Sequence, residues 1–250
     1  MLLEGKVTIV TGAGHGIGRA YASGIANEGG RVVVADIDGA AADTVAEEIG
    51  SQALAVQADV ASLASCQDMV AKTLAHFGQV DGLINNAAIF ATIPISRVGF
   101  QEIAEEEWDR VMNVNVKGVW FCCRAVTPAL QERQGGSIVN IASSTVLSGS
   151  AGRIHYVSSK AAIIGFSRVL ARELGPDNIR VNTIAPGSTL SEANPSEDIV
   201  KMRSAGLGTR ALRRVERPDD LVGTALYLLS DLSSFVTGQM IAVGGGDVMN

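Results

Sequence analysis

Short apolar runs alternate with longer helical patterns along most of this chain of 250 residues, and that alternation restricts its fold more than any other feature. The apolar runs have the length and composition of buried strands. They are Val7–Thr11, Arg31–Asp36, Ala53–Ala58, Val80–Asn85, Ser137–Ala142, Arg180–Ile184 and Met240–Val243. Helices are predicted over Ile17–Glu28, Ala40–Ile49, Leu63–Phe77, Glu105–Gln131, Tyr156–Glu173 and Pro218–Leu229.

Strand–helix alternation of this kind favours parallel pairing with right-handed crossovers. We therefore predict an α/β fold with a single-domain, Rossmann-type doubly wound parallel sheet of about seven strands, with helices on both faces. The expected strand order is 3-2-1-4-5-6-7. No Pro- or Ser-rich linker divides the chain, so residues 1–250 are expected to form one domain. The least regular stretch, about 188–216, is long enough to be a lid over a binding site.

The composition excludes several classes of function. The net charge is −6 and no basic block occurs, so nucleic acid is not an expected partner. No apolar run approaches the roughly 18 residues of a membrane span, and no signal-peptide pattern precedes the first strand. Cys66, Cys122 and Cys123 have neither a disulfide nor a metal-ligand spacing. We expect a cytoplasmic protein with reduced thiols and no metal site.

A glycine-rich turn, Thr11–Gly18, joins the first strand to the first helix. Gly12, Gly16 and Gly18 would permit a sharp turn and a close backbone approach. The N–H groups of His15, Ile17 and their neighbours would then face a pyrophosphate at the helix N-terminus. This context indicates dinucleotide binding.

Asp36 ends the second strand, where an acidic side chain accepts hydrogen bonds from ribose hydroxyls and repels a 2′-phosphate. Its alternative role is to cap the next helix, together with Asp38. His15 adds no fixed positive charge that would favour NADP. The sequence therefore predicts NAD as the cofactor.

Two further strand ends contribute candidate cofactor contacts. Asp59 and Val60 follow the third strand and could flank an adenine, while Asn86, Ala87 and Ala88 follow the fourth. Ordinary turn chemistry explains either group equally well.

Tyr156 and Lys160 lie four residues apart, on one face of a predicted helix. An isolated tyrosine has a pKa near 10, and a nearby ammonium is expected to lower it. Tyr156 could then exchange a proton with an alcohol or ketone. The alternative is an amphipathic helix with a lysine that reaches solvent. His155 is expected to be a packed or surface residue rather than the base.

Ser143 and Asn115 strengthen the catalytic interpretation. Ser143 stands 13 residues before Tyr156, at a strand end, where its hydroxyl could stabilise charge on the reacting oxygen. Ser144 is the rival for this role. Asn115 is unfavourable inside the long helix, and a break is expected near Asn113–Asn115, where Asn115 could hold a water that leads protons to Lys160.

Together these motifs resemble the short-chain dehydrogenase/reductase family from Lys6 to Gly246. The family's Thr-Gly-x-x-x-Gly-x-Gly matches Thr11–Gly18, and its Asn-Asn-Ala-Gly matches Asn85–Ala88 apart from Ala88 in place of glycine. Its Asn–Ser–Tyr–Lys tetrad corresponds to Asn115, Ser143, Tyr156 and Lys160.

The resemblance implies further roles near the nicotinamide. Lys160 would also hold the nicotinamide ribose hydroxyls. The family's Pro-Gly corresponds to Pro186-Gly187, and its amide-binding threonine corresponds to Ser191. The resemblance also implies a homotetramer or homodimer whose chemical step needs no metal.

The implied activity is NAD-linked interconversion of a secondary alcohol and a ketone on a small molecule. Ser144, Thr145, Arg153 and Leu190 are candidate substrate contacts, and Arg153 could hold a carboxylate or sulfonate or could be a surface or subunit contact. The alternatives are a 3-oxoacyl-[acyl-carrier-protein] reductase and a nucleotide sensor without catalysis. Complete retention of the tetrad counts against the sensor.

Overall fold

A single seven-stranded parallel sheet with the order β3-β2-β1-β4-β5-β6-β7 forms the centre of the protein. The computed structural model describes residues 1–90, 93–192, 195–204, 207–208 and 210–249. The strands are β1 Val7–Thr11, β2 Arg31–Asp36, β3 Ala53–Gln57, β4 Gly82–Asn85, β5 Gly136–Ile141, β6 Ile179–Pro186 and β7 Met240–Val243. The predicted fold class and strand order are confirmed.

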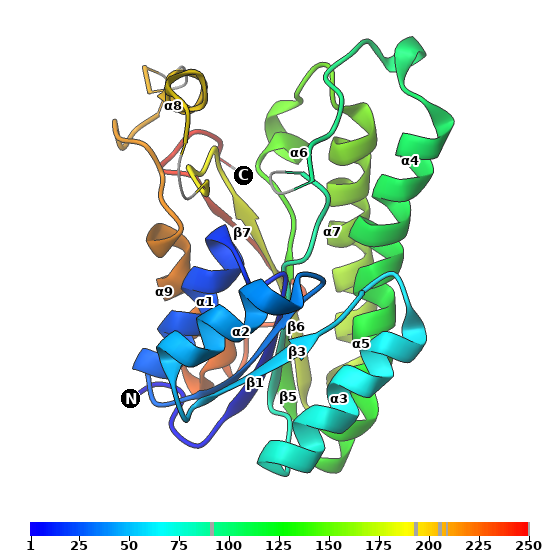
Figure 1. Ribbon diagram of the computed structural model, residues 1–250, viewed down its shortest axis with the longest axis vertical. Coiled ribbons are helices and arrows are strands. Elements are labelled where there is room, and N and C mark those ends of the chain that lie inside the picture. Colours follow the sequence, from blue (N-terminus) through cyan, green and yellow to red (C-terminus); the bar gives the residue numbers. More distant parts are fainter. Residues whose placement is uncertain (91–92, 193–194, 205–206, 209, 250) are drawn as a thin grey trace.

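Helices cover both faces of the sheet (Figure 1). On one face lie α1 Gly16–Asn27, α2 Gly39–Ile49 and α9 Asp219–Leu229. On the other lie α3 Leu63–Phe77, α4 Glu105–Met112, α5 Gly118–Glu132 and α7 Ile154–Leu174. Each face buries its own apolar cluster, and Ile9 and Val10 of β1 contribute to opposite clusters. This division follows from the alternating side-chain directions of a strand that is buried on both faces.

The long predicted helix, Glu105–Gln131, is interrupted. A π-helical turn, Asn113–Lys117, separates α4 from α5, in agreement with the break expected near Asn113–Asn115. The predicted irregular stretch 188–216 also needs correction, because it contains helix α8 Glu197–Ser204. Residues 193, 194, 205, 206 and 209 of that stretch lie outside the described residues. The short helix α6 Thr145–Ser148 was not predicted.

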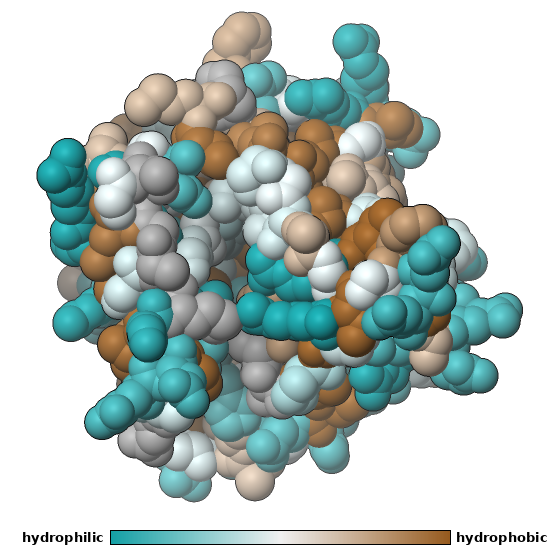
Figure 2. All heavy atoms as spheres, turned by 90° about the horizontal axis from the view of Figure 1, so that it is seen from above, coloured by the Kyte–Doolittle hydropathy of each residue, from teal (hydrophilic) through white to brown (hydrophobic). Residues whose placement is uncertain are grey.

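The two ends of the sheet differ in character. At the carboxyl ends of the strands, the loops, α6 and α8 form the upper end in Figure 1, which Figure 2 shows from above.

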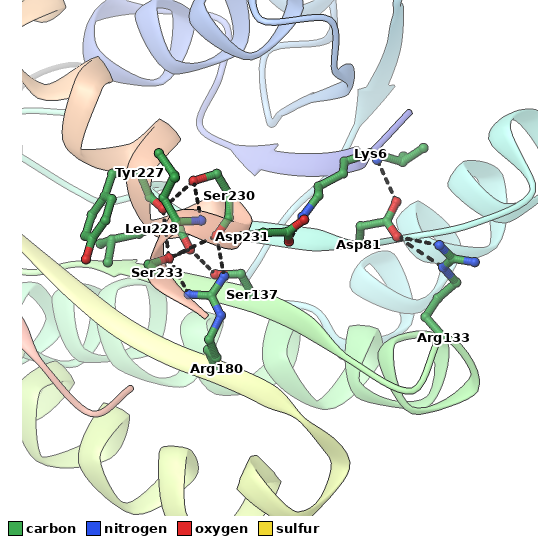
Figure 3. A network of polar contacts seen from close by, with 12 residues as sticks. Lys6, Asp81, Arg133, Ser137, Arg180, Tyr227, Leu228, Ser230, Asp231 and Ser233 are labelled. Carbon is green, nitrogen blue, oxygen red and sulfur yellow. Dashed lines mark hydrogen bonds and ion pairs between the residues drawn. The ribbon is translucent and has the colours of Figure 1, made fainter. Parts of the chain in front are cut away.

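At the amino ends, polar side chains join strand β6 and the start of β4 to segments near the ends of α9 and α5 (Figure 3). Arg180 donates to Ser233 Oγ at 2.7 Å and to the Ser230 carbonyl at 3.1 Å, while Arg133 pairs with Asp81 at 3.1 Å. These contacts lie at the lower end of the sheet, whereas the cavity described below lies among the loops at the upper end.

Candidate active site

A cavity of about 850 Å³ opens at the carboxyl ends of strands β1 to β6. In a doubly wound sheet this is the edge at which ligands bind. Most of the predicted cofactor contacts line it: Gly12, His15, Gly16, Ile17, Asp36, Asp59, Val60, Asn86, Ala87, Ala88, Tyr156, Lys160, Pro186, Gly187 and Ser191. The predicted Ser143, Ser144, Thr145, Arg153 and Leu190 line it as well. Gly18 and Asn115 are not among the lining residues.

The glycine turn adopts backbone conformations that side chains disfavour. Gly12 has φ +64° and Gly16 has φ +50°. A Cβ at Gly12 would lie 2.8 Å from Ala87 Cα, and one at Gly18 would lie 2.0 Å from the Gly12 carbonyl oxygen. Gly18 therefore permits the turn to close, while Gly12 and Gly16 face the cavity. Among the residues that the structure describes, no side chain caps α1, so its first N–H groups stay available to an anion.

Asp36 is 93% buried at the end of β2, and its carboxylate is fixed by two backbone donors. It accepts hydrogen bonds from Gly14 N at 2.8 Å and from Asp38 N at 3.0 Å. The cap of α2 is Asp38, which accepts from Ala41 N at 3.2 Å, and this hydrogen bond lowers the pKa of Asp38. The helix-cap role therefore belongs to Asp38, and Asp36 presents a negative charge to the cavity.

The loop after β4 is bound to the glycine turn. Asn86 Nδ2 donates to the Thr11 and Gly12 carbonyl oxygens, both at 3.0 Å. Thr11 Oγ1 accepts from Asn86 N and Ala87 N at 3.1 Å each. Asn86 thus stabilises the turn with its side chain and also lines the cavity. The two roles that the sequence left as alternatives, a turn residue and a cavity residue, are therefore compatible.

Tyr156 lies in the first turn of α7 and is 94% buried. Its ring stacks on Phe90 with centroids 4.3 Å apart. Burial raises the pKa of Tyr156, while a hydrogen bond with Ser143 and the charges of Arg153 and Arg203 lower it by less. The expected net lowering is therefore wrong for the protein alone, because the loss of hydration penalises the phenolate more than these neighbours favour it.

Lys160 lies one helical turn further along α7. Its ammonium donates to the Ile141 carbonyl oxygen at 2.8 Å and lies 5.9 Å from the centre of the Tyr156 ring. Burial lowers the pKa of Lys160 to about 8. The side chain does not reach solvent, which rules out the alternative of a surface lysine.

Ser143 and Ser144 both border the cavity, but they differ in their contacts. The Ser143 hydroxyl lowers the pKa of the Tyr156 phenol, and its Oγ also accepts from Thr145 Oγ1 at 2.9 Å. Ser144 donates its backbone N–H to the Pro186 carbonyl oxygen at 2.8 Å. This arrangement favours Ser143 as the residue that acts together with Tyr156.

Asn115 sits fully buried in the π-helical turn and holds the loop after β4. Its Oδ1 accepts from Ile89 N at 2.8 Å, and its Nδ2 donates to Ser159 Oγ at 3.2 Å. A π-helical turn widens the helix locally and often occurs at a functional site. Asn115 therefore positions the segment that carries Phe90, and the expected water near Lys160 stays a prediction.

The loop after β6 closes against the glycine turn. A Cβ at Gly16 would lie 2.9 Å from the Ser191 carbonyl oxygen. Beneath this loop, buried Glu216 accepts from Thr189 Oγ1 at 2.8 Å, and Leu190 N donates to the Glu216 carbonyl oxygen at 2.8 Å. Sequence reasoning missed this support, because Thr189 and Glu216 are 27 residues apart and share no motif.

Three other residues at the site were also missed or set aside. Phe90 follows the predicted Asn-Asn-Ala-Ala segment by two positions, but only the fold places it on Tyr156. Arg203 of α8 lines the cavity, although no motif distinguishes it from the neighbouring arginines. His155 is fully buried, with its Nε2 at 3.4 Å from Glu107 Oε1, and is a packed residue as expected.

The fold and the cavity together define a doubly wound α/β protein with a site at the carboxyl edge of its sheet. The family model described as enoyl-(acyl carrier protein) reductase matches residues 12–247. A probable short-chain type dehydrogenase/reductase of Bradyrhizobium diazoefficiens is 41% identical over 97% of this chain and 87% of its own length. The chain belongs to the short-chain dehydrogenase/reductase family, whose members are oxidoreductases that bind a nicotinamide dinucleotide.

Two relatives carry a more specific description. The 3-oxoacyl-[acyl-carrier-protein] reductase of Thermotoga maritima is 37% identical over the full length of both chains. The crystal structure of 3-ketoacyl-(acyl-carrier-protein) reductase from Brucella melitensis complexed with NADH has a TM-score of 0.89 at 34% identity. It covers 98% of this chain and 99% of its own. Within the described residues, no helix is long and apolar enough to cross a membrane.

Proposed function

We propose that this protein is an NAD(H)-dependent oxidoreductase that interconverts a secondary alcohol and a ketone on a small molecule. The observation that carries the proposal is the buried Tyr156 phenol, which lies one helical turn from Lys160 and whose pKa the Ser143 hydroxyl lowers. It faces the same cavity as the Asp36 carboxylate and the glycine turn. One continuous site thus joins an acid–base group to residues suited to a dinucleotide.

The residues around the glycine turn fit a nicotinamide dinucleotide. The side-chain-free surfaces at Gly12 and Gly16 and the uncapped start of α1 suit a pyrophosphate. The fixed Asp36 carboxylate suits a ribose diol and opposes a 2′-phosphate. Ile37, the next residue, is 58% exposed and offers no positive charge to such a phosphate. These features support NAD as the preferred cofactor.

When bound, nicotinamide dinucleotide supplies or accepts the hydride. In ketone reduction, Tyr156 donates its phenolic proton to the carbonyl oxygen, while the Ser143 hydroxyl stabilises the charge that develops there. The Lys160 ammonium favours the resulting phenolate electrostatically. In alcohol oxidation, the Tyr156 phenolate accepts the hydroxyl proton. Because the pKa of Tyr156 is raised, the phenol carries its proton near neutral pH. It can therefore donate that proton in ketone reduction, whereas it must first lose the proton to act as a base in alcohol oxidation.

The first test is a panel of secondary alcohols and ketones assayed with NAD(H) and NADP(H), for wild type and Tyr156→Phe. The variant should lose about 100- to 10,000-fold in kcat, because the acid–base group is gone. NADH binding, followed by fluorescence titration, should persist. Cofactor binding without turnover across the panel would instead favour a nucleotide sensor, and near-wild-type turnover by Tyr156→Phe would contradict the mechanism.

A 3-oxoacyl-[acyl-carrier-protein] reductase is the second candidate, and the relatives from Thermotoga maritima and Brucella melitensis favour it. Higher kcat/KM for a 3-oxoacyl carrier-protein thioester with NADPH than for any free ketone with NADH would establish it. We further propose a cytoplasmic homotetramer or homodimer, testable by light scattering. We also propose that residues 188–216 act as a lid, which protection of this segment from proteolysis by NADH and ketone together would support.

A further inference from the structure

Two arginines from distant parts of the chain converge on the substrate side of Tyr156. Arg153 immediately precedes α7, and Arg203 lies in α8. Their guanidinium carbons lie 5.7 Å and 6.0 Å from the centre of the same ring, that of Phe90. Because Phe90 stacks on Tyr156, both guanidinium groups stand one aromatic ring away from the proton donor.

The positive charge at this point is only partly neutralised by the protein. The Arg153 guanidinium donates to the Ser150 hydroxyl, and no carboxylate of the described residues is within ion-pair distance of it. Arg203 pairs with Glu192 at 2.8 Å, so among the described residues only one of the two guanidinium groups has a carboxylate partner. Burial, and then the charges of Arg97 and Arg203, lower the pKa of Arg153, while Tyr156 raises it by less.

The burial of Arg203 provides a second, independent observation. The residue is 93% buried and lines the cavity, and its Nε finds no hydrogen-bond partner among the described residues. The protein itself therefore leaves part of the hydrogen-bonding capacity of the Arg203 guanidinium unused, which costs free energy for a buried charged group. Guanidinium groups match the geometry of planar or tetrahedral oxyanions by donating two parallel hydrogen bonds.

The two arginines lie away from the acidic cluster of the cavity. Asp36, Asp38 and Asp59, together with Arg19, lie at the end where the glycine turn suits the dinucleotide, whereas Arg153 and Arg203, together with Glu192, lie at the Tyr156 end. The arginines are therefore poorly placed to serve the adenosine end of the cofactor. Their position suits the second ligand of the reaction.

We propose that the substrate carries an anionic group, a carboxylate, sulfonate or phosphonate, which Arg153 and Arg203 hold a few bonds from the reacting carbonyl. This inference rests on the proposed oxidoreductase function and specifies its substrate class as compact keto acids and the corresponding hydroxy acids. Since Arg203 belongs to α8, a substrate anion held by Arg203 would also contact this helix. An acyl thioester has no charge next to its keto group, so this arrangement separates the proposal from a carrier-protein reductase.

The test uses a series of ketones with the same acetonyl skeleton. Acetoacetate, acetonylsulfonate and acetonylphosphonate differ in their anion, and methyl acetoacetate is the neutral analogue. The variants are Arg153→Met and Arg203→Met, which keep an unbranched apolar stem and remove the charged guanidinium group. Arg172→Met, an exposed arginine in the last turn of α7, is the matched control.

Two measurements on the full-length protein are needed: kcat/KM with NADH, and calorimetric binding of each ketone to the enzyme–NADH complex. Wild type should prefer at least one acid to the ester. Arg153→Met and Arg203→Met should each lower the acid-to-ester ratio of kcat/KM roughly 10- to 100-fold, the effect of losing a charge-assisted hydrogen bond. Arg172→Met should leave that ratio unchanged. The acid with the largest loss identifies the anion.

The outcomes distinguish the two proposals. Equal losses on the acids and the ester, or equal binding of both by wild type, would overturn the anion site while leaving the oxidoreductase function intact. Arginine-dependent binding of the acids without turnover of any ketone or alcohol would contradict the proposed function but support the anion site. NADH titration of each variant confirms that the fold and the cofactor site are retained.

Discussion

Lys160 offers the sharpest quantitative check on the structure, because its ammonium is removed from water inside the fold. Burial lowers its pKa from 10.5 to about 8, and its hydrogen-bond acceptor is the neutral Ile141 carbonyl oxygen rather than a carboxylate. Between these two values the unfolded chain binds more protons than the folded chain. The free energy of unfolding contributed by Lys160 must therefore rise with pH across this window.

The magnitude follows from linkage. Each pKa unit corresponds to about 1.36 kcal/mol, so the full shift amounts to about 3 kcal/mol. Between about pH 7 and about pH 9.5, integration of the proton difference gives a gain of about 2 kcal/mol. Lys160→Met removes the titrating group. Wild type should therefore gain about 2 kcal/mol in stability relative to the variant over this interval, whatever their difference at pH 7.

The assay is urea unfolding of both proteins without cofactor at the two pH values, with the free energy of unfolding extrapolated to water. Cysteines and tyrosines also titrate in this range, but they are common to both proteins and largely cancel in the difference. Lys72→Met, which removes an exposed lysine of α3, should track wild type at both pH values. A wild-type-minus-Lys160→Met difference that stays constant, or that falls as pH rises, would refute the inferred desolvation of Lys160.

Three other predictions follow from the same site. The kcat/KM for ketone reduction should fall as pH rises through about 8, because Lys160 then loses the charge that stabilises the Tyr156 phenolate; a profile that is flat to pH 9.5 would contradict this. Asp36→Asn should raise the ratio of NADP(H) to NAD(H) kcat/KM by roughly 10-fold or more, since a like charge near the 2′-phosphate is removed, and an unchanged ratio would argue against that role. Asn115→Ala should lower the free energy of unfolding by about 1–3 kcal/mol, because the buried Ile89 N–H loses its acceptor, and urea unfolding with no measurable change would disprove it.

Much of the fold and of the glycine turn could be predicted from local sequence patterns. The strand and helix alternation predicted the sheet and its order, because parallel pairing and right-handed crossovers leave few other arrangements. The turn at Gly12 and Gly16 was predictable, since its backbone needs residues without a Cβ. The break in the long helix was predictable as well, because Asn113 and Asn115 are poor residues for a helix interior.

The predictions from sequence were wrong where contacts between residues far apart in the chain determine the structure or the pKa. Helix α8 was missed because the long segment between β6 and α9 has little apolar periodicity, and its Arg203 is placed by contacts with Phe90 and Glu192. The pKa of Tyr156 was expected to fall, since Lys160 is visible in the sequence as a neighbour. Burial of the phenol, which raises that pKa, is a property of the assembled core and cannot be read from spacing.

The sequence by itself determined the topology and the types of groups at the reaction centre, because hydrophobic periodicity, glycine backbone freedom and helical spacing are local properties. Only the tertiary structure decided how those groups are charged and what lies beside them. It places Lys160 away from water, assigns the α2 cap to Asp38 rather than Asp36, and brings Arg153 and Arg203 to one ring. Desolvation and long-range proximity depend on the whole packed chain, and these two effects govern acidity and substrate charge at the site.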